Sequence, residues 1–265
     1  MSSAPLYAKS VPNQDRGLDA VIWQQNLQAY VSNDPLYGIR FSEHGDRRVS
    51  LSGTTTPSAD DRWSVADSAA AGGTYSLSNV AGADGELSLN STGTTNHFGV
   101  EAQGPAIFNL PTHASDARGD LVFQARVDFG DADTIFVGLS ESGDNFLSST
   151  SQLPDADYIG FYTEDNGTTV LFVNDEADSG AAQTYDVSTY IQSSGYQNLS
   201  FRVNKRDNSV ELSVNGYWLP KRLNGVLAAN LPNETLCPRL SATAGGGTTA
   251  PTIDFTDVDV FMAQG

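Results

Sequence analysis

Acidic side chains are the commonest groups in this sequence that could carry chemistry, and several fall in pairs within predicted loops. Asp and Glu number 32, against 14 Lys and Arg. The loop pairs are Asp131 with Asp133, Glu141 with Asp144, and Asp155 with Asp157. Carboxylate oxygens are ligands that Ca²⁺ prefers, but none of these loops has a complete calcium-ligand spacing. We therefore expect solvated loop acids and no cofactor, with calcium as the alternative.

Histidine and cysteine give no sign of a metal or nucleophilic site. His44, His97 and His113 lack the short spacings that bring two imidazoles to one metal, so we expect ordinary loop histidines and no metal. Cys237 is the only cysteine and cannot form an internal disulfide. No histidine or basic cluster lies near it in sequence, which predicts a small buried residue rather than a reactive thiol.

The clearest secondary-structure signal lies in residues 198–218, where apolar and polar side chains alternate. The apolar positions are Leu199, Phe201, Val203, Val210, Leu212 and Val214. Alternation with a period of two indicates strands with one buried face, here two strands joined by the polar residues 205–208. Asn215 and Gly216 predict a further tight turn, because both tolerate positive φ. This hairpin needs a second apolar face to pack against.

The rest of the chain after residue 60 supplies such a face. About eleven short strands separated by turns follow one another, without a convincing helix. In the last strand, apolar residues stand at odd positions up to Phe255 and at even positions from Val258 onward. This change predicts a β-bulge near Thr256 and Asp257. We expect an all-β fold, an antiparallel two-sheet jelly-roll sandwich with an N-terminal extension.

The first 59 residues are expected to form that extension, joined to a jelly-roll domain at 60–265 by the linker 52–60. Residues 37–41 and 47–51 predict a small separate hairpin. Apolar residues of the extension are Trp23, Leu27, Tyr30, Tyr37 and Phe41. They either pack on the domain or anchor the protein to a partner. We expect the anchoring role, with the domain able to fold alone.

Charge and the N-terminal sequence restrict the partners. The formal net charge of −18 repels nucleic acid and anionic membranes. No membrane-spanning run and no signal peptide are present in the sequence as given, which predicts folding in the cytoplasm.

The order of several strand segments resembles the concanavalin A-like lectin/glucanase (laminin-G-like) jelly roll, in the form found as a structural protein of tailed-phage virions. The segments are 123–127, 136–141, 157–161, 201–203, 214–216 and 258–260. The resemblance covers roughly residues 60–263. It implies a non-enzymatic capsid decoration or cement protein on the virion surface, assembled in the host cytoplasm. It also implies a homo-oligomer, expected to be a trimer, bound to the major capsid protein.

The resemblance also raises two carbohydrate-directed alternatives. Glucanases of the family carry two glutamates in a pattern like E-x-D-x-E, which this sequence lacks, so we expect a protein that is not an enzyme. Asp257 and Asp259 share a strand face, but no third acid follows them. A lectin-like module that binds surface glycans remains the alternative. Its candidate stacking residues are Trp63, Tyr162, Tyr217 and Trp218.

Overall fold

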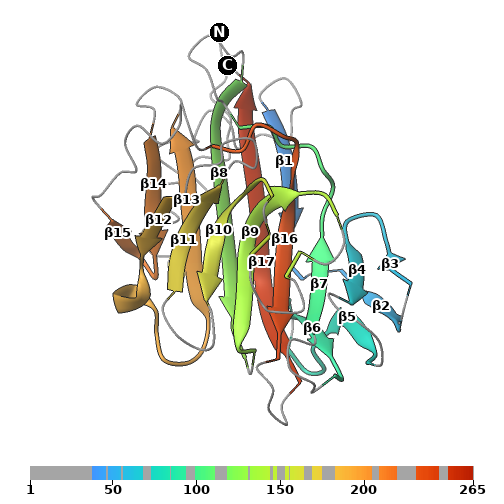
Figure 1. Ribbon diagram of the computed structural model, residues 1–265. Helices are drawn as coiled ribbons and strands as arrows, with labels where there is room; N and C mark the ends of the chain where they lie inside the picture. The colour runs from blue at the N-terminus through green and yellow to red at the C-terminus, as the bar shows by residue number, and fades with distance from the viewer. Residues whose placement is uncertain are drawn as a thin grey trace, which may run out of the picture.

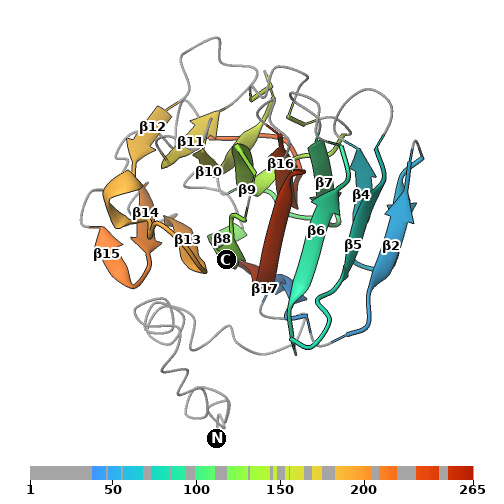
Figure 2. The same ribbon diagram turned by 90° about the horizontal axis from the view of Figure 1, so that it is seen from below.

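Two antiparallel sheets stacked face to face make up the computed structural model of this protein (Figures 1 and 2). The structure describes residues 38–45, 47–54, 56–67, 73–83, 85–93, 99–110, 118–130, 132–143, 146–147, 153–154, 156–163, 169–174, 183–204, 209–219, 231–244 and 250–264. Within them the only helical element is the 3₁₀ turn η3 (Ser188–Tyr190). The predicted all-β jelly-roll sandwich is confirmed.

The nine-stranded sheet has the order β15-β14-β13-β8-β17-β6-β5-β2, with β1 paired to β17. Its strands are β1 (Gly38–Glu43), β2 (Ser50–Gly53), β5 (Tyr75–Asn79), β6 (Leu87–Ser91), β8 (Arg118–Asp128), β13 (Gln197–Asn204), β14 (Ser209–Val214), β15 (Tyr217–Leu219) and β17 (Thr252–Gln264). Most neighbours in this sheet are far apart in sequence, so the fold depends on non-local pairing.

The eight-stranded sheet has the order β12-β11-β10-β9-β16-β7-β4-β3. Its strands are β3 (Ser58–Ala59), β4 (Ser64–Asp67), β7 (Gly99–Gln103), β9 (Thr134–Glu141), β10 (Tyr158–Thr163), β11 (Thr169–Asn174), β12 (Gln183–Asp186) and β16 (Leu236–Thr243). Figure 2 shows this sheet as one layer and the nine-stranded sheet as the other.

The predicted hairpin at 198–218 forms as expected and supplies much of the core. All six of its predicted apolar positions are at most 1% exposed. Phe201 on β13 stacks on Phe123 of β8, with ring centroids 5.0 Å apart, and meets Phe161 of the opposite sheet at 6.3 Å. Asn215 and Gly216 have φ of 50° and 79°, which confirms the predicted tight turn.

The β-bulge predicted in the last strand is also present. The register of β17 against β8 shifts between Phe255 and Asp257. Before the shift Phe255 points into the core, and after it Val258 and Val260 do so. The extra residue turns Asp257 and Asp259 toward the outer face of the nine-stranded sheet.

The expected domain boundary at residues 59 and 60 is wrong, because the sandwich includes the chain from Gly38 onward. β1 pairs with β17, β2 with β5 and β3 with β4, so the described residues of the expected hairpin, 38–41 and 47–51, do not pair with each other. Phe41 is only 6% exposed and packs edge-on against Trp63 at 5.0 Å, so it is a core residue rather than an anchor. Trp23, Leu27, Tyr30 and Tyr37 lie outside the described residues.

Candidate functional site

Of the four aromatic residues expected to stack on sugars, the structure exposes the ring of Tyr217. It is 60% exposed, whereas Trp63 and Tyr162 are 1% and 6% exposed, so those two cannot serve as stacking platforms. The backbone of Trp218 is in β15, but its side chain lies outside the described residues. Among the side chains that the structure describes, Tyr217 is therefore the only one of the four predicted stacking residues with an exposed ring.

Tyr217 stands on a rigid turn. Its ring contacts that of Tyr190 in η3, with centroids 5.6 Å apart and planes tilted by 48°. The preceding Asn215 donates from Nδ2 to the carbonyl of Tyr190 and to Gln197 Oε1, at 2.8 and 2.7 Å. Asn215 Oδ1 accepts the backbone N–H of Asn198 at 2.8 Å. The amide side chains thus hold the two tyrosines together, and we call this pair the Tyr190–Tyr217 platform.

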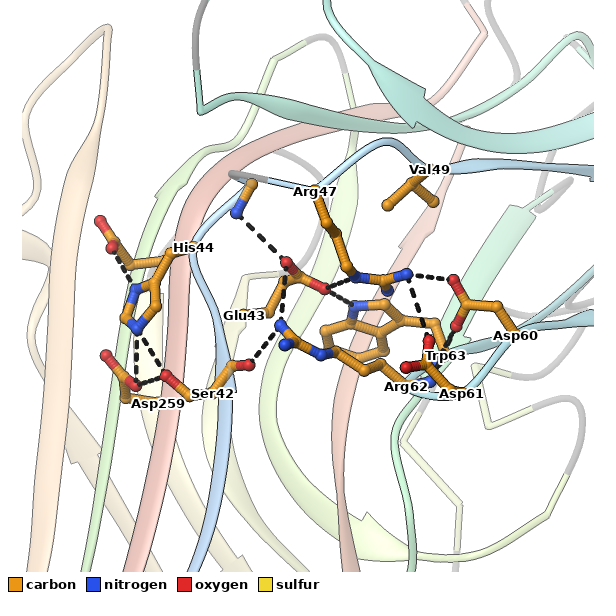
Figure 3. A network of polar contacts seen from close by, with 12 residues as sticks. Ser42, Glu43, His44, Arg47, Val49, Asp60, Asp61, Arg62, Trp63 and Asp259 are labelled. Carbon is orange, nitrogen blue, oxygen red and sulfur yellow. Dashed lines mark hydrogen bonds and ion pairs between the residues drawn. The ribbon is translucent and has the colours of Figure 1, made fainter. Parts of the chain in front are cut away.

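Trp63 instead belongs to a buried polar network, shown in Figure 3, around the fully buried carboxylate of Glu43. Glu43 Oε2 accepts from Trp63 Nε1 at 3.1 Å and from Arg47 Nε at 2.8 Å. Glu43 Oε1 accepts the backbone N–H of Gly45 at 3.2 Å and a 3.5 Å contact from Arg62. Because this carboxylate is saturated with donors from the protein, it is not available to a ligand.

Asp60 extends this network at its solvent side. Its Oδ1 accepts the backbone N–H groups of Arg62 and Trp63, both at 2.8 Å, and its Oδ2 accepts from Arg47 at 2.5 Å. Partial burial alone would raise the pKa of Asp60, but the hydrogen bonds from Arg47 and from the two backbone groups outweigh it and lower that pKa. This carboxylate therefore favours folding in its charged form.

A second buried ion pair lies on the outer face of the eight-stranded sheet. Arg239 on β16 is 1% exposed and donates to Glu101 Oε2 at 3.1 Å and to Ser140 Oγ at 2.7 Å. It also contacts the ring of Phe146 at 4.9 Å and donates to the carbonyl of Gly143 at 2.6 Å. Beside it, a small apolar cluster on the same face includes Phe146 and Tyr162. Gly143 and Phe146 are thereby held against this face.

The predicted loop acids do not form a metal centre in the part of the chain that the structure describes. No group of three His, Cys, Asp or Glu there could hold a metal ion. Asp157 is 1% exposed, and its Oδ2 accepts the backbone N–H groups of Asn233 and Glu234 at 2.8 and 2.9 Å, so it is not the solvated acid expected. Asp131, Asp144 and Asp155 lie outside the described residues.

Cys237 is buried, as the sequence predicts. Burial raises the pKa of its thiol, although Arg239 and Ser140 act in the opposite direction. A thiol of this kind is mostly protonated at neutral pH and a poor nucleophile. No helix among the described residues is long and apolar enough to cross a membrane.

His44 is not the isolated loop histidine that the sequence suggests. It follows β1 directly, and its Nδ1 lies 2.9 Å from Asp257 Oδ1 on β17. Its Nε2 lies 2.5 Å from Ser42 Oγ, which in turn donates to Asp259 Oδ1 at 2.5 Å (Figure 3). The sequence does place Ser42 two residues before His44, and Asp257 two residues before Asp259. In a strand, residues at this spacing lie on the same face. Only the pairing of β1 with β17 brings them together.

Comparisons with known proteins agree on the fold. No family model matches the chain, and no curated protein matches it in sequence. Among solved structures, an endo-1,3-beta-glucanase from Streptomyces sioyaensis aligns with a TM-score of 0.54 and 13% identity, over 88% of this chain and 99% of that one. Arcelin-5, a lectin-like defense protein from Phaseolus vulgaris, aligns at 0.52 and 8%, over 84% and 97%. The Emp47p carbohydrate recognition domain aligns at 0.50 and 11%, over 87% and 99%.

These likenesses show that the protein has the concanavalin A-like lectin/glucanase fold. They also contradict the expectation that it is not an enzyme, because the same fold carries a glucanase. The missing E-x-D-x-E pattern therefore does not exclude catalysis. At identities of 8–13% the likeness establishes the fold and assigns no reaction.

Proposed function

We propose that this protein binds carbohydrate and that Tyr217 is the residue on which the sugar stacks. The observation that carries the proposal is the 60% exposed ring of Tyr217, held beside Tyr190 by the side chain of Asn215. Tyrosine is enriched at binding interfaces because its ring is apolar and its hydroxyl polar, and an exposed ring held in place by hydrogen bonds suits such a contact. The names of the similar structures, a carbohydrate recognition domain and a lectin-like protein, support the same ligand class.

The platform suits a saccharide because it combines an apolar face with polar surroundings. The tyrosine ring offers a flat surface to the C–H face of a pyranose. The adjoining loop carries the exposed residues Gln192 and Ser193, whose side chains supply hydrogen-bonding groups. Since Asn215 and Gln197 already bond to each other and to the backbone, the site loses little conformational entropy on binding.

The test is binding of the purified protein to a panel of soluble polysaccharides and a glycan array, with reducing-sugar release followed in the same samples. We expect binding to one saccharide class, weakened about tenfold or more by Tyr217→Ala, the loss of one stacking contact of about 1.4 kcal/mol or more. Ile39→Ala is the matched control, because Ile39 is the other large hydrophobic exposed in the described structure. Equal binding by Tyr217→Ala, or no binding to any saccharide, contradicts the proposal.

A second candidate is a structural role in a bacteriophage particle. It is supported by the resemblance of residues 60–263 to virion jelly rolls and by the net charge of −18, which limits aggregation of a protein displayed in many copies. In this proposal the protein is a trimer on the capsid surface that contacts the major capsid protein through residues before Gly38. Purified capsids should then bind the full chain but not a chain beginning at Gly38. Full occupancy by the shortened chain would exclude this mode of attachment.

A further inference from the structure

Four polar side chains meet where β1 pairs with β17, on the outer face of the nine-stranded sheet. Ser42 and His44 belong to the end of β1, and Asp257 and Asp259 to β17. Ser42 and Asp259 are direct cross-strand partners. Figure 3 shows one nitrogen of the His44 imidazole facing both the hydroxyl of Ser42 and the carboxylate of Asp259. This group is separate from the Tyr190–Tyr217 platform.

Three of these residues form an ordered chain of contacts. Ser42 Oγ lies 2.5 Å from His44 Nε2, and His44 Nδ1 lies 2.9 Å from Asp257 Oδ1. A hydroxyl, an imidazole and a carboxylate in this order constitute the arrangement by which a serine is activated as a nucleophile. For a reaction, the imidazole must accept the hydroxyl proton at Nε2, while the carboxylate fixes the ring through Nδ1–H.

The carboxylate is itself held in place. Asp257 Oδ2 accepts from Thr256 Oγ1 at 2.9 Å, and Thr256 Oγ1 accepts from Arg126 NH1 at 3.3 Å. Ile253 and Phe255 point into the core, and without a bulge Asp257 would do so too, because it follows at the same spacing of two. The bulge between Phe255 and Asp257 turns Asp257 outward instead. The backbone irregularity and the hydrogen bonds together orient Asp257 toward His44.

A positive charge lies beside the serine. Arg40 NH2 is 3.3 Å from Ser42 Oγ and 3.2 Å from Asp259 Oδ1. A cationic donor can stabilise an oxyanion only when it faces that oxygen, and Arg40, which also pairs with Asp259, is the cation beside Ser42 in the structure. The side chains of Arg40 and His44 are 31% and 36% exposed, whereas those of Asp257 and Asp259 are 12% and 3% exposed, so the group faces solvent on its Arg40 and His44 side.

We propose that Ser42, His44 and Asp257 form a nucleophilic centre that hydrolyses carboxylic esters. Ser42 Oγ attacks the ester carbonyl, and its proton passes to His44 Nε2. The bond from the carbonyl carbon to the alcohol oxygen then breaks, and His44 returns the proton to the departing alcohol. Water attacks the acyl-serine and gives a proton to His44. The bond to Ser42 Oγ breaks, and Ser42 recovers that proton, which releases the acid.

Asp259 restrains this centre in the structure. Ser42 donates its hydroxyl proton to Asp259 Oδ1 at 2.5 Å, and that proton must be redirected to His44 before attack. An amide is a weaker acceptor than a carboxylate. Asp259→Asn should therefore accelerate ester turnover, whereas in a merely structural polar cluster the same change would have no such effect.

The experiment treats the full-length protein with a fluorophosphonate probe, which bonds to activated serines, and locates the adduct by mass spectrometry. We expect the adduct on Ser42, and slow hydrolysis of p-nitrophenyl acetate. Ser42→Ala should abolish both, while Ser50→Ala on the exposed edge strand β2 should change neither. No adduct on Ser42 in the wild-type protein overturns the proposal, and this readout requires no variant to fold.

Variants of the other two residues separate activation from positioning. His44→Gln should lower the turnover number for p-nitrophenyl acetate by about 100-fold or more, the typical contribution of a general base. Asp257→Asn should lower kcat with little change in KM, and Asp257→Glu should restore part of it. Undiminished kcat in His44→Gln would contradict the mechanism. Saccharide binding at Tyr217 should be the same in Ser42→Ala, so failure of either proposal leaves the other testable.

Discussion

The indole of Trp63 donates a 3.1 Å hydrogen bond to Glu43, and this bond ties the approach to β4 in one sheet to the end of β1 in the other. Glu43 is fully buried and also pairs with Arg47 at 2.8 Å. Removing one partner of a buried ion pair lowers the free energy of unfolding strongly, because the remaining charge is then buried without a partner. Glu43, Arg47 and Trp63 therefore form a structural link between the two sheets.

Glu43→Gln should lower the free energy of unfolding by about 3 kcal/mol, within the range for breaking a buried ion pair. The amide group would place hydrogens against Arg47 or Trp63, both of which are donors. Urea denaturation measures the change. Asp61→Asn is the control, since Asp61 lies 3.5 Å from the same arginine but is 82% exposed, and its loss should change stability by less than about 0.5 kcal/mol. Equal effects of the two variants would contradict this account.

Phe201→Ala should lower the free energy of unfolding by about 3–5 kcal/mol. Phe201 is 1% exposed and touches Phe123 in its own sheet and Phe161 in the other, so the truncation leaves a cavity between the sheets. Tyr217→Ala removes an aromatic ring of similar size that is 60% exposed and should cost much less. Thermal unfolding followed by circular dichroism compares the two. A cost below about 1 kcal/mol for Phe201→Ala would show that the site collapses without a cavity.

The parts of the fold that depend on local patterns could be predicted from the sequence. The alternation around Phe201, the turn at Asn215 and the bulge before Asp257 are properties of a few neighbouring residues. Each follows from strand geometry or from tolerance of positive φ. None of these features depends on which strand is the pairing partner.

The parts that depend on which strands pair could not be predicted. Phe41 and Trp63 are large aromatics in short segments, and residue type alone does not tell whether a ring packs inward. The centre at Ser42 requires β1 to pair with β17, whose residues lie more than 200 positions away in the chain. Local periodicity contains no information on such a partner, so it predicts only an ordinary loop residue at His44.

Asp254→Asn should stabilise the protein at neutral pH. Burial raises the pKa of the Asp254 carboxyl above its ordinary value of 3.8, the charges of Glu86 and Asp128 raise it further, and a hydrogen bond from Ser88 opposes them. The folded state therefore binds this proton more tightly than the unfolded state does. The resulting contribution to stability is present below the ordinary pKa and is lost as pH rises through the folded-state pKa.

The measurement is the melting temperature of wild type and Asp254→Asn between pH 3 and pH 8. The advantage of the variant should be largest near neutral pH and should shrink below about pH 4, the ordinary range of a carboxyl. Asp60→Asn is the control of opposite sign: the pKa of Asp60 is lowered, so this variant should be less stable at neutral pH and approach wild type in acid. A wild type more stable than Asp254→Asn at pH 7 would refute the assignment.

The last prediction concerns where the folded domain begins. A chain that starts at Gly38 should fold and melt cooperatively, whereas a chain that starts at Asp60 should not. The segment between them contains β1, with six residue pairs to β17, and β2, with four to β5. It also buries Phe41, Val49 and Leu51. Each such side chain contributes about 1.5–3 kcal/mol.

The three side chains together contribute about 5–9 kcal/mol, which is comparable with the whole stability of an ordinary domain. Loss of the segment also exposes one edge of β17 beside Val258 and Val260, and an unpaired apolar edge promotes aggregation. Calorimetry and size-exclusion chromatography of the two shortened chains test this. If the chain beginning at Asp60 melts cooperatively at the same temperature as the chain beginning at Gly38, then β1 and β2 are peripheral and the sandwich is complete without them.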